Sequence, residues 1–152
     1  MLRTQLNGAL KDAMKAKDQR AVSTLRLILA ALKDRDIADR GKGGVDEGIS
    51  DDEILQLLQS MIKQRHDSIE AYNKGGRQEL ADREAEEIKI IGRFLPEQMS
   101  EEEITIAVAD AIKDCEASSL KEMGQVMAQL RENHAGCMDF GKASAVVKDR
   151  LG

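Results

Sequence analysis

The chain has 152 residues, 41% of them hydrophobic and 34% charged, which is the composition of a soluble globular protein able to build a core. Aromatic residues make up only 2%, tryptophan is absent and there is a single proline, so an all-β sandwich or barrel is nearly excluded. The formal net charge is -5, and the charges before residue 97 cancel, so the whole acidic excess lies in residues 97–152. An acidic balance argues against a general nucleic-acid binder, although it leaves room for one local basic face.

Strong helix formers dominate the composition and predict an all-α protein that begins with two amphipathic helices. The first helix places apolar side chains on one stripe, four residues apart: Leu2, Leu6, Leu10 and Met14. We expect Asp18 to cap the second helix, whose apolar face runs towards Ile37. The glycine-rich segment from Gly41 to Gly44 then predicts a loop. Because no strand precedes it and no Lys-Ser/Thr pair follows it, a phosphate-binding loop is not expected there.

Capping and stop signals delimit two further helices before the single proline. Ser50 and Glu53 have the spacing of a capping box and open the third helix. The pair Gly75-Gly76 ends this helix, because glycine adopts the left-handed conformation of a helix stop without a steric cost. The fourth helix is expected to run from about Arg77 until Pro96 stops it.

The last third of the chain predicts a small three-helix bundle. Two more capping boxes, Ser100 to Glu103 and Ser119 to Glu122, open the first two of its helices. Asp139 is expected to cap the last helix. The expected fold is therefore all-α, with about four helices in an N-terminal subdomain, residues 1–95, and a C-terminal bundle, residues 96–152.

The sequence contains no set of residues that predicts catalysis, metal binding or a cofactor. The two cysteines stand apart from each other and from ligand-spaced histidines, so neither a disulfide framework nor a zinc site is expected. His66 and His134 have no nucleophile or second ligand at a helical spacing, and we interpret both as surface side chains. No apolar stretch can span a bilayer and no secretory signal is expected, so the predicted location is the cytosol.

One acidic pair on the expected fourth helix admits two interpretations. Glu84 and Glu87 are three residues apart and therefore neighbours on one helix face, with Arg77 two turns earlier. Paired carboxylates can perform acid–base chemistry when one raises the pKa of the other. The favoured interpretation is an ion-pair network that ties two helices together, because carboxylates next to an arginine more often have that role.

The first 33 residues carry seven cations against two acids. This local excess predicts either a phosphate-facing patch for RNA or an ordinary solvated helix face, and both interpretations stay open. Aromatic side chains that could stack on unpaired bases are almost absent. Any RNA that binds should therefore be recognised by its backbone and shape, as a folded tRNA is.

Five short segments follow one another along the chain in an order typical of one protein family. They are Thr24-Leu25-Arg26, Gly76-Arg77 with Glu84 and Glu87, Leu95-Pro96-Glu97-Gln98-Met99-Ser100, Met123-Gly124-Gln125-Val126-Met127, and Val147-Lys148 with Leu151. Together they resemble the GatB/YqeY family, specifically its short stand-alone YqeY-like members, over nearly the whole chain.

This resemblance implies an all-helical protein in two parts. The C-terminal bundle would be similar to the tail domain of the B subunit of the tRNA-dependent amidotransferase. That enzyme converts glutamate or aspartate esterified to tRNA into the amide, with glutamine as the ammonia donor. The resemblance implies that the tail contacts tRNA, whereas the kinase-like active site, with its metal and ATP sites, belongs to a cradle domain for which this chain has no counterpart.

We therefore expect a non-catalytic helical module associated with tRNA, with no cofactor and no metal. The candidate tRNA contacts are cations at or near family-like positions: Arg26, Arg65, Arg77, Lys142 and Lys148. Two alternatives stay open. One is a component that works with amidotransferase subunits and contributes to carbon–nitrogen ligase activity with glutamine as amide donor. The other is an adaptor that binds another protein.

Overall fold

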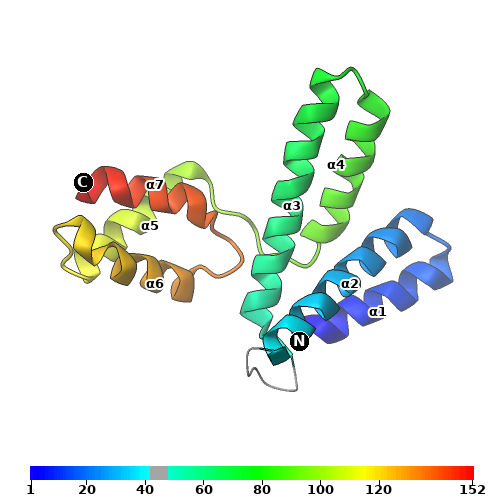
Figure 1. Cartoon of the computed structure of the whole chain (residues 1–152), viewed down its shortest axis with the longest axis horizontal. Coiled ribbons are helices and arrows are strands. Elements are labelled where there is room, and N and C mark those ends of the chain that lie inside the picture. The colour runs from blue at the N-terminus through cyan, green and yellow to red at the C-terminus, as the bar shows by residue number, and fades with distance from the viewer. Residues whose placement is uncertain (42–47) are drawn as a thin grey trace. The chain divides into compact units, whose positions relative to one another are not determined.

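The computed structural model describes residues 1–41 and 48–152, and every regular element in these residues is helical. It confirms the expected all-α fold (Figure 1). The elements in chain order are α1 (Leu2–Ala16), α2 (Gln19–Gly41), α3 (Asp51–Lys74), α4 (Gln78–Gly92), α5 (Glu101–Asp114), the short 3₁₀ helix η1 (Leu120–Glu122), α6 (Met123–Asn133) and α7 (Phe140–Leu151). The glycine-rich segment predicted as a loop lies outside the described residues, except that Gly41 ends α2.

Contacts between the elements divide the chain into two compact units, Met1–Pro96 and Glu97–Gly152. The first unit contains α1 to α4, and the second contains α5 to α7 with η1. Each unit has its own cluster of buried apolar side chains. Independent folding of the two parts as subdomains stays a prediction.

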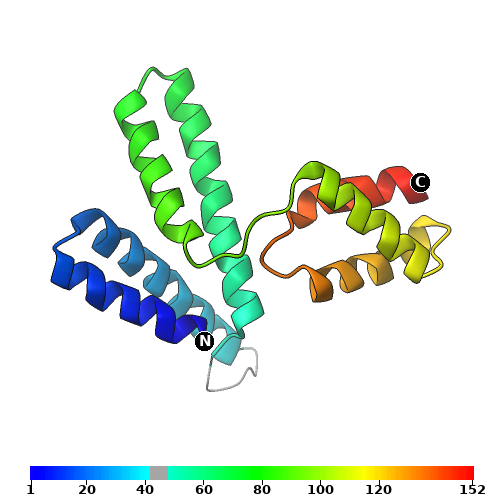
Figure 2. The same cartoon turned by 180° about the vertical axis from the view of Figure 1, so that it is seen from behind.

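The first unit is built from two helical pairs. Figures 1 and 2 show α1 beside α2, and α3 beside α4, with each pair joined by a short turn. The two pairs meet chiefly where α2 packs against α4 and α3. The core between them includes the fully buried side chains Leu6, Leu25, Ile28, Ile54, Leu58 and Ile91. This core holds α1 and α2, and with them the basic N-terminal segment, in place.

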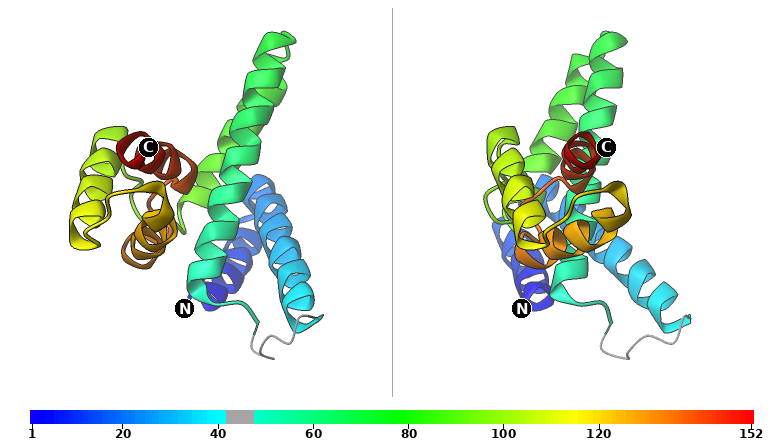
Figure 3. Two further views of the ribbon diagram at one scale, coloured as in Figure 1. Left: turned by 60° about the vertical axis from the view of Figure 1, so that its left-hand side comes forward. Right: turned by 90° about the vertical axis from the view of Figure 1, so that its left-hand side faces the viewer.

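The second unit is a small bundle in which α5, α6 and α7 pack against one another in pairs, as expected for a three-helix bundle (Figure 3). All three helices contribute to its core, as does Met138 in the loop between α6 and α7. The core side chains include Ile104, Val108, Val126, Leu130, Met138, Ala143 and Val147. The loop is tied down by a hydrogen bond from the Met99 N–H to the carbonyl of Cys137, 2.8 Å long.

Side-chain caps begin four helices where the sequence predicts them. Asp18 Oδ1 accepts the Ala21 N–H at 3.1 Å before α2, and Asp139 Oδ1 accepts two N–H groups of α7. Ser50 accepts the N–H of the third residue of α3. Ser100 forms the complete reciprocal capping box of α5, with bonds in both directions to Glu103. Each such cap stabilises its helix by about 1 kcal/mol, because it satisfies an N–H that the helix leaves without a partner.

The third predicted capping box is wrong. Ser119 makes no side-chain cap, and the segment after it is the 3₁₀ helix η1 rather than the start of an α-helix. The Glu122 carboxylate instead accepts hydrogen bonds from the backbone N–H and the hydroxyl of Ser118, at 3.1 and 3.2 Å. The Glu122 N–H donates to the Ser119 carbonyl at 3.1 Å rather than to the Ser119 hydroxyl, and α6 begins only at Met123.

Two helix features also differ from the sequence expectations. The fourth helix ends at Gly92, before Pro96, because the N–H groups of the next three residues bond to carbonyls three residues back and tighten the chain into turns. Met14 and Ile37, expected on apolar faces, are 51% and 56% exposed. In α1 the adjacent Ala13 is buried instead of Met14, so the buried face of the helix is turned away from the position of Met14. In α2 the last buried side chain is Leu32, more than one turn before Ile37.

None of the helices in the described part of the chain is both long and apolar enough to cross a membrane.

Candidate functional site

The structure offers little conventional catalytic chemistry. Across residues 1–41 and 48–152, no three His, Cys, Asp or Glu side chains converge to hold a metal ion. His66 is exposed and His134 is half-buried. The Cys115 thiol donates to Gln129 Oε1 at 3.1 Å, and burial raises the pKa of the Cys137 thiol, so that this group stays protonated rather than becoming a thiolate nucleophile. These side chains have surroundings typical of structural residues.

Arg65 does not present a free guanidinium. Its Nε donates to Glu87 Oε2 at 2.8 Å, and Glu84 Oε2 lies 3.9 Å away. Its Nη1 also donates to the Met61 carbonyl at 3.1 Å. The Arg65 and Glu87 side chains are only 12% and 16% exposed, so the pair ties α3 to α4 from a half-buried position. The predicted ion-pair network is confirmed, but its cation is Arg65 on the neighbouring helix rather than Arg77.

Arg77 is paired locally and lies in solvent. It is the residue before α4, and its Nε donates to Glu79 Oε1 at 2.8 Å. The guanidinium lowers the pKa of the Glu79 carboxyl from its ordinary value. Both side chains are more than 60% exposed, so a bound phosphate would have to compete with a weak, screened pair.

The two C-terminal candidates, Lys142 and Lys148, differ in whether they form an ion pair. Lys142 Nζ lies 3.4 Å from Glu101 Oε1, whereas Lys148 is exposed and makes no ion pair within the described chain. The two lysines are six residues apart on α7, which separates them by about 120° around the helix axis. They therefore do not share one face of α7.

Arg26, like Lys148, is an exposed candidate. It lies on the exposed side of α2 and makes no ion pair with any described residue. Lys33, seven residues later, is also exposed and lies on the same face, about 10 Å further along the helix. By contrast, Arg20 of α2 pairs with Glu86 of α4 at 3.0 Å. Arg26 and Lys33 thus present their charge to solvent on one face of α2, whereas the exposed Arg35, nine residues after Arg26, lies on the opposite side of the helix.

A polar network that no sequence pattern predicted joins α1, α2 and the start of α3. The Arg3 guanidinium donates to both carboxylate oxygens of Asp36, at 2.7 and 2.6 Å, and to the Ile49 carbonyl at 3.0 Å. Asp36 Oδ1 also accepts the Ile49 N–H at 3.0 Å. Arg3 holds the pKa of the Asp36 carboxyl below its ordinary value, and Asp36 raises that of Arg3. No local motif could reveal this network, because Arg3 and Asp36 are 33 residues apart.

Gly48 makes this network possible. Its φ of +89° lies in the left-handed region, and a Cβ there would collide with the Arg3 guanidinium and the Asp36 carboxylate. The Arg3 guanidinium therefore has a structural role and is not available to bind phosphate.

The described surface has a hollow in each unit. In the first unit, a space of about 380 Å³ lies between α1, α2 and the end of α4, and its charged lining residues are Asp12, Asp18 and Arg93. In the second unit, a groove of about 310 Å³ runs between α5 and α6. The charged or titratable residues that line this groove are Glu103, Asp110, Asp114 and His134.

Comparison with known proteins finds similar mitochondrial proteins in yeasts. The protein called altered inheritance of mitochondria protein 41, mitochondrial, from Lachancea thermotolerans is 37% identical over 116 residues, which are 75% of this chain and 59% of that protein. Its counterpart in Kluyveromyces lactis is 34% identical over 116 residues, 74% of this chain and 60% of that protein. The Saccharomyces cerevisiae protein (strain YJM789) is 28% identical over 130 residues, 82% of this chain and 68% of that protein. The chain thus spans about 60% of the length of the first two relatives.

These names contradict the cytosolic location predicted from the sequence. All three relatives are named as mitochondrial proteins and none as a cytosolic one. The prediction rested on the absence of a secretory signal and a membrane span, and neither absence bears on mitochondrial targeting. It is therefore wrong.

The family itself is identified over nearly the full length. The model of the YqeY-like protein family matches residues 3–151, so it includes every helix of both units. The resemblance inferred from the short segments is confirmed. The chain belongs to the YqeY-like family.

Proposed function

We propose that this protein is a non-catalytic helical module of the GatB/YqeY type that associates with tRNA through the cationic surface of α2. The observation that carries the proposal is the pair Arg26 and Lys33, both exposed, both without an ion pair in the described chain, and both on one helix face. Cations about 10 Å apart along a rigid helix can contact separate phosphates of a folded RNA backbone. The scarcity of aromatic side chains favours such backbone recognition over stacking on bases.

The other candidates take secondary roles in this proposal. Lys148 is exposed and unpaired, and is the C-terminal contact we favour. Arg77 and Lys142 can reach phosphate only by leaving exposed pairs with Glu79 and Glu101, which costs little. Arg65 would have to break a half-buried pair, so its contribution is to position α3 and α4.

A tRNA-binding titration at several salt concentrations tests the proposal. Each phosphate contact contributes roughly 0.9 to the slope of log affinity against log salt concentration, because it releases condensed counterions. The double variant Arg26→Gln, Lys33→Gln should therefore bind more weakly and reduce that slope by about two. The matched control, Lys113→Gln with Lys121→Gln, removes the same charge from exposed positions in the second unit and should leave the slope unchanged. Equal slopes for both variants would contradict the assignment.

The C-terminal contacts are tested in the same titration. We expect Lys142→Ala with Lys148→Ala to reduce the slope by one unit or more. An unchanged affinity would remove both lysines from the proposed site. Because the relatives are named as mitochondrial, mitochondrial tRNA is the first RNA to use.

A contribution to amide formation is the second candidate function, favoured by the membership of the GatB/YqeY family. With glutamine, ATP and misacylated tRNA, we expect no amide from the chain alone, since its described residues contain no cluster that could hold a metal ion. If it is an amidotransferase component, adding it to the partner subunits should raise the rate of amide formation. An unchanged rate would exclude this role.

A further inference from the structure

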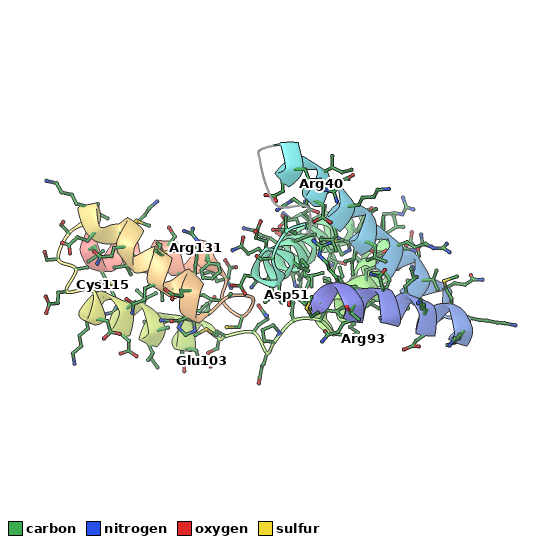
Figure 4. All side chains as sticks on the ribbon, turned by 90° about the horizontal axis from the view of Figure 1, so that it is seen from below. Arg40, Asp51, Arg93, Glu103, Cys115 and Arg131 are labelled. Atoms are coloured by element: carbon green, nitrogen blue, oxygen red, sulfur yellow. The ribbon has the colours of Figure 1, made fainter. Side chains whose placement is uncertain are left out.

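The groove between α5 and α6 has features that neither the bundle core nor tRNA binding explains. It is lined along α5 by residues that recur every three or four positions, from Glu103 near one end to Asp114 at the other. Eleven residues of α-helix span about 16 Å, so the groove is about three helical turns long. Figure 4 marks the two ends of α5 by the labelled side chains of Glu103 and Cys115.

The groove has an accessible apolar strip above a buried floor. The half-buried side chains of Met99 and Ala107 belong to the strip, whereas Ala111 and Leu130 form the floor and are 3% and 1% exposed. The small side chain of Ala107 lets another backbone approach closely. Ile106, which also lines it, is 63% exposed, the highest value for a large apolar side chain in the second unit. A strip of this shape and length fits one face of an α-helix.

Two negative charges beside this strip have no ion-pair partner in the described residues. Asp110 and Asp114 line the groove in the last turns of α5, and neither forms an ion pair within the described residues. Asp114 only accepts a 3.3 Å hydrogen bond from the Gln129 amide. Their position is unfavourable, because the carbonyl end of a helix carries negative partial charge and prefers cations. A bound cation would relieve this repulsion.

We propose that this groove binds an amphipathic helix of a partner protein, one whose apolar face is flanked by lysine or arginine. The apolar strip supplies contact area, and the two unpaired aspartates select the charge of the partner and its orientation. The net charge of -5 on residues 97–152 adds a long-range attraction for a basic segment, and the two aspartates disfavour a phosphate group at the groove itself. The groove is therefore a protein-binding surface, separate from the cations of α2.

The test uses the full chain and a fluorescein-labelled helical peptide of about 14 residues, with leucine on one face and lysine on both flanks. Two further peptides serve as probes of specificity. One replaces every lysine with glutamate, and the other scrambles the same leucine and lysine residues so that no apolar face remains. We expect the wild-type chain to bind the amphipathic basic peptide at least tenfold more tightly than either of the others.

Paired variants separate the groove from net charge alone. Asp110→Asn with Asp114→Asn removes the two groove charges, and Glu102→Gln with Asp149→Asn removes two exposed charges that do not line it. We expect the first pair to weaken peptide binding about tenfold and the second pair less than twofold. Ile106→Ser should also weaken binding, while circular dichroism confirms that each variant is folded.

Three results would overturn the proposal. Equal losses from the two variant pairs would mean that binding follows net charge rather than the groove. Equal affinity for the amphipathic and scrambled peptides would mean that no apolar face is recognised. Self-association of the protein in sedimentation, abolished by Asp110→Asn with Asp114→Asn, would assign the groove to a second copy of this chain instead of a partner.

Discussion

Asp36→Asn tests the network that anchors the start of α3 to the first two helices. The substitution keeps the shape of the side chain but removes its charge, and it turns an amide N–H₂ towards one guanidinium nitrogen of Arg3. The wild-type carboxylate takes part in two hydrogen bonds with Arg3 and one with the Ile49 N–H, at 16% exposure of the Asp36 side chain. We expect a loss of about 2 kcal/mol in the free energy of unfolding, between the values for an exposed pair and a fully buried one.

The pH dependence gives this prediction a sharper signature. Arg3 lowers the pKa of Asp36 in the folded state, so the carboxylate contributes stability at pH values above its unfolded pKa. That contribution is lost as pH falls through the lower, folded-state pKa, because the proton then binds both states. The difference in stability between wild type and Asp36→Asn should thus be constant from about pH 5 to 7 and shrink below about pH 4.

Tyrosine fluorescence is a suitable assay. The chain has one tyrosine and no tryptophan, and Tyr72 lies in α3, so its emission during urea unfolding reports on the first unit. Asp34→Asn is the matched control, since Asp34 is an exposed residue of α2 without an ion pair in the described chain. Its effect should stay within about 0.5 kcal/mol. Equal losses from the two variants, or a difference that persists unchanged at pH 3, would refute the role given to Arg3.

Five further substitutions concern stability and are measured by urea unfolding. Gly48→Ala should destabilise the first unit by at least about 1 kcal/mol, because the φ of Gly48 is positive and other atoms occupy the position of the new Cβ. Gly8→Ala should stabilise the protein by about 0.5–1 kcal/mol, because Gly8 lies inside α1 and has open space around it. Ser100→Ala should cost about 1 kcal/mol through loss of the capping box, and no loss would argue against it. Thr24→Val should be neutral or stabilising, because the buried Thr24 hydroxyl has no hydrogen-bond partner. Arg65→Met should destabilise by about 2–3 kcal/mol, since it leaves two glutamates without their cation.

Local signals predicted most of the fold. Helix starts at Ser50, Ser100 and Asp139 follow from contacts within three residues, so the sequence contains all the information they need. The Ser119 box has the same letters and fails, because a neighbouring serine competes for Glu122. Such competition depends on the turn geometry, which no spacing rule describes.

The candidate site was less predictable, because ion pairing decides which cations are free. No local pattern in the sequence distinguishes Arg65 from Arg77. In the structure, however, Arg65 is half-buried between two helices, whereas Arg77 lies in solvent. The partner of Arg65 is 22 residues away and is fixed by the packing of α3 against α4. The same dependence on tertiary contacts hid the Arg3–Asp36 network and the groove beside α5.

The separation of buried side chains into two clusters affects how any measurement of stability should be read. In the described chain, no side chain belongs to both clusters. A cavity made by Leu130→Ala would remove contacts in the second cluster and leave those around Leu6 intact. We therefore expect tyrosine emission and circular dichroism to give different unfolding midpoints for this variant, so a single melting temperature would average two transitions.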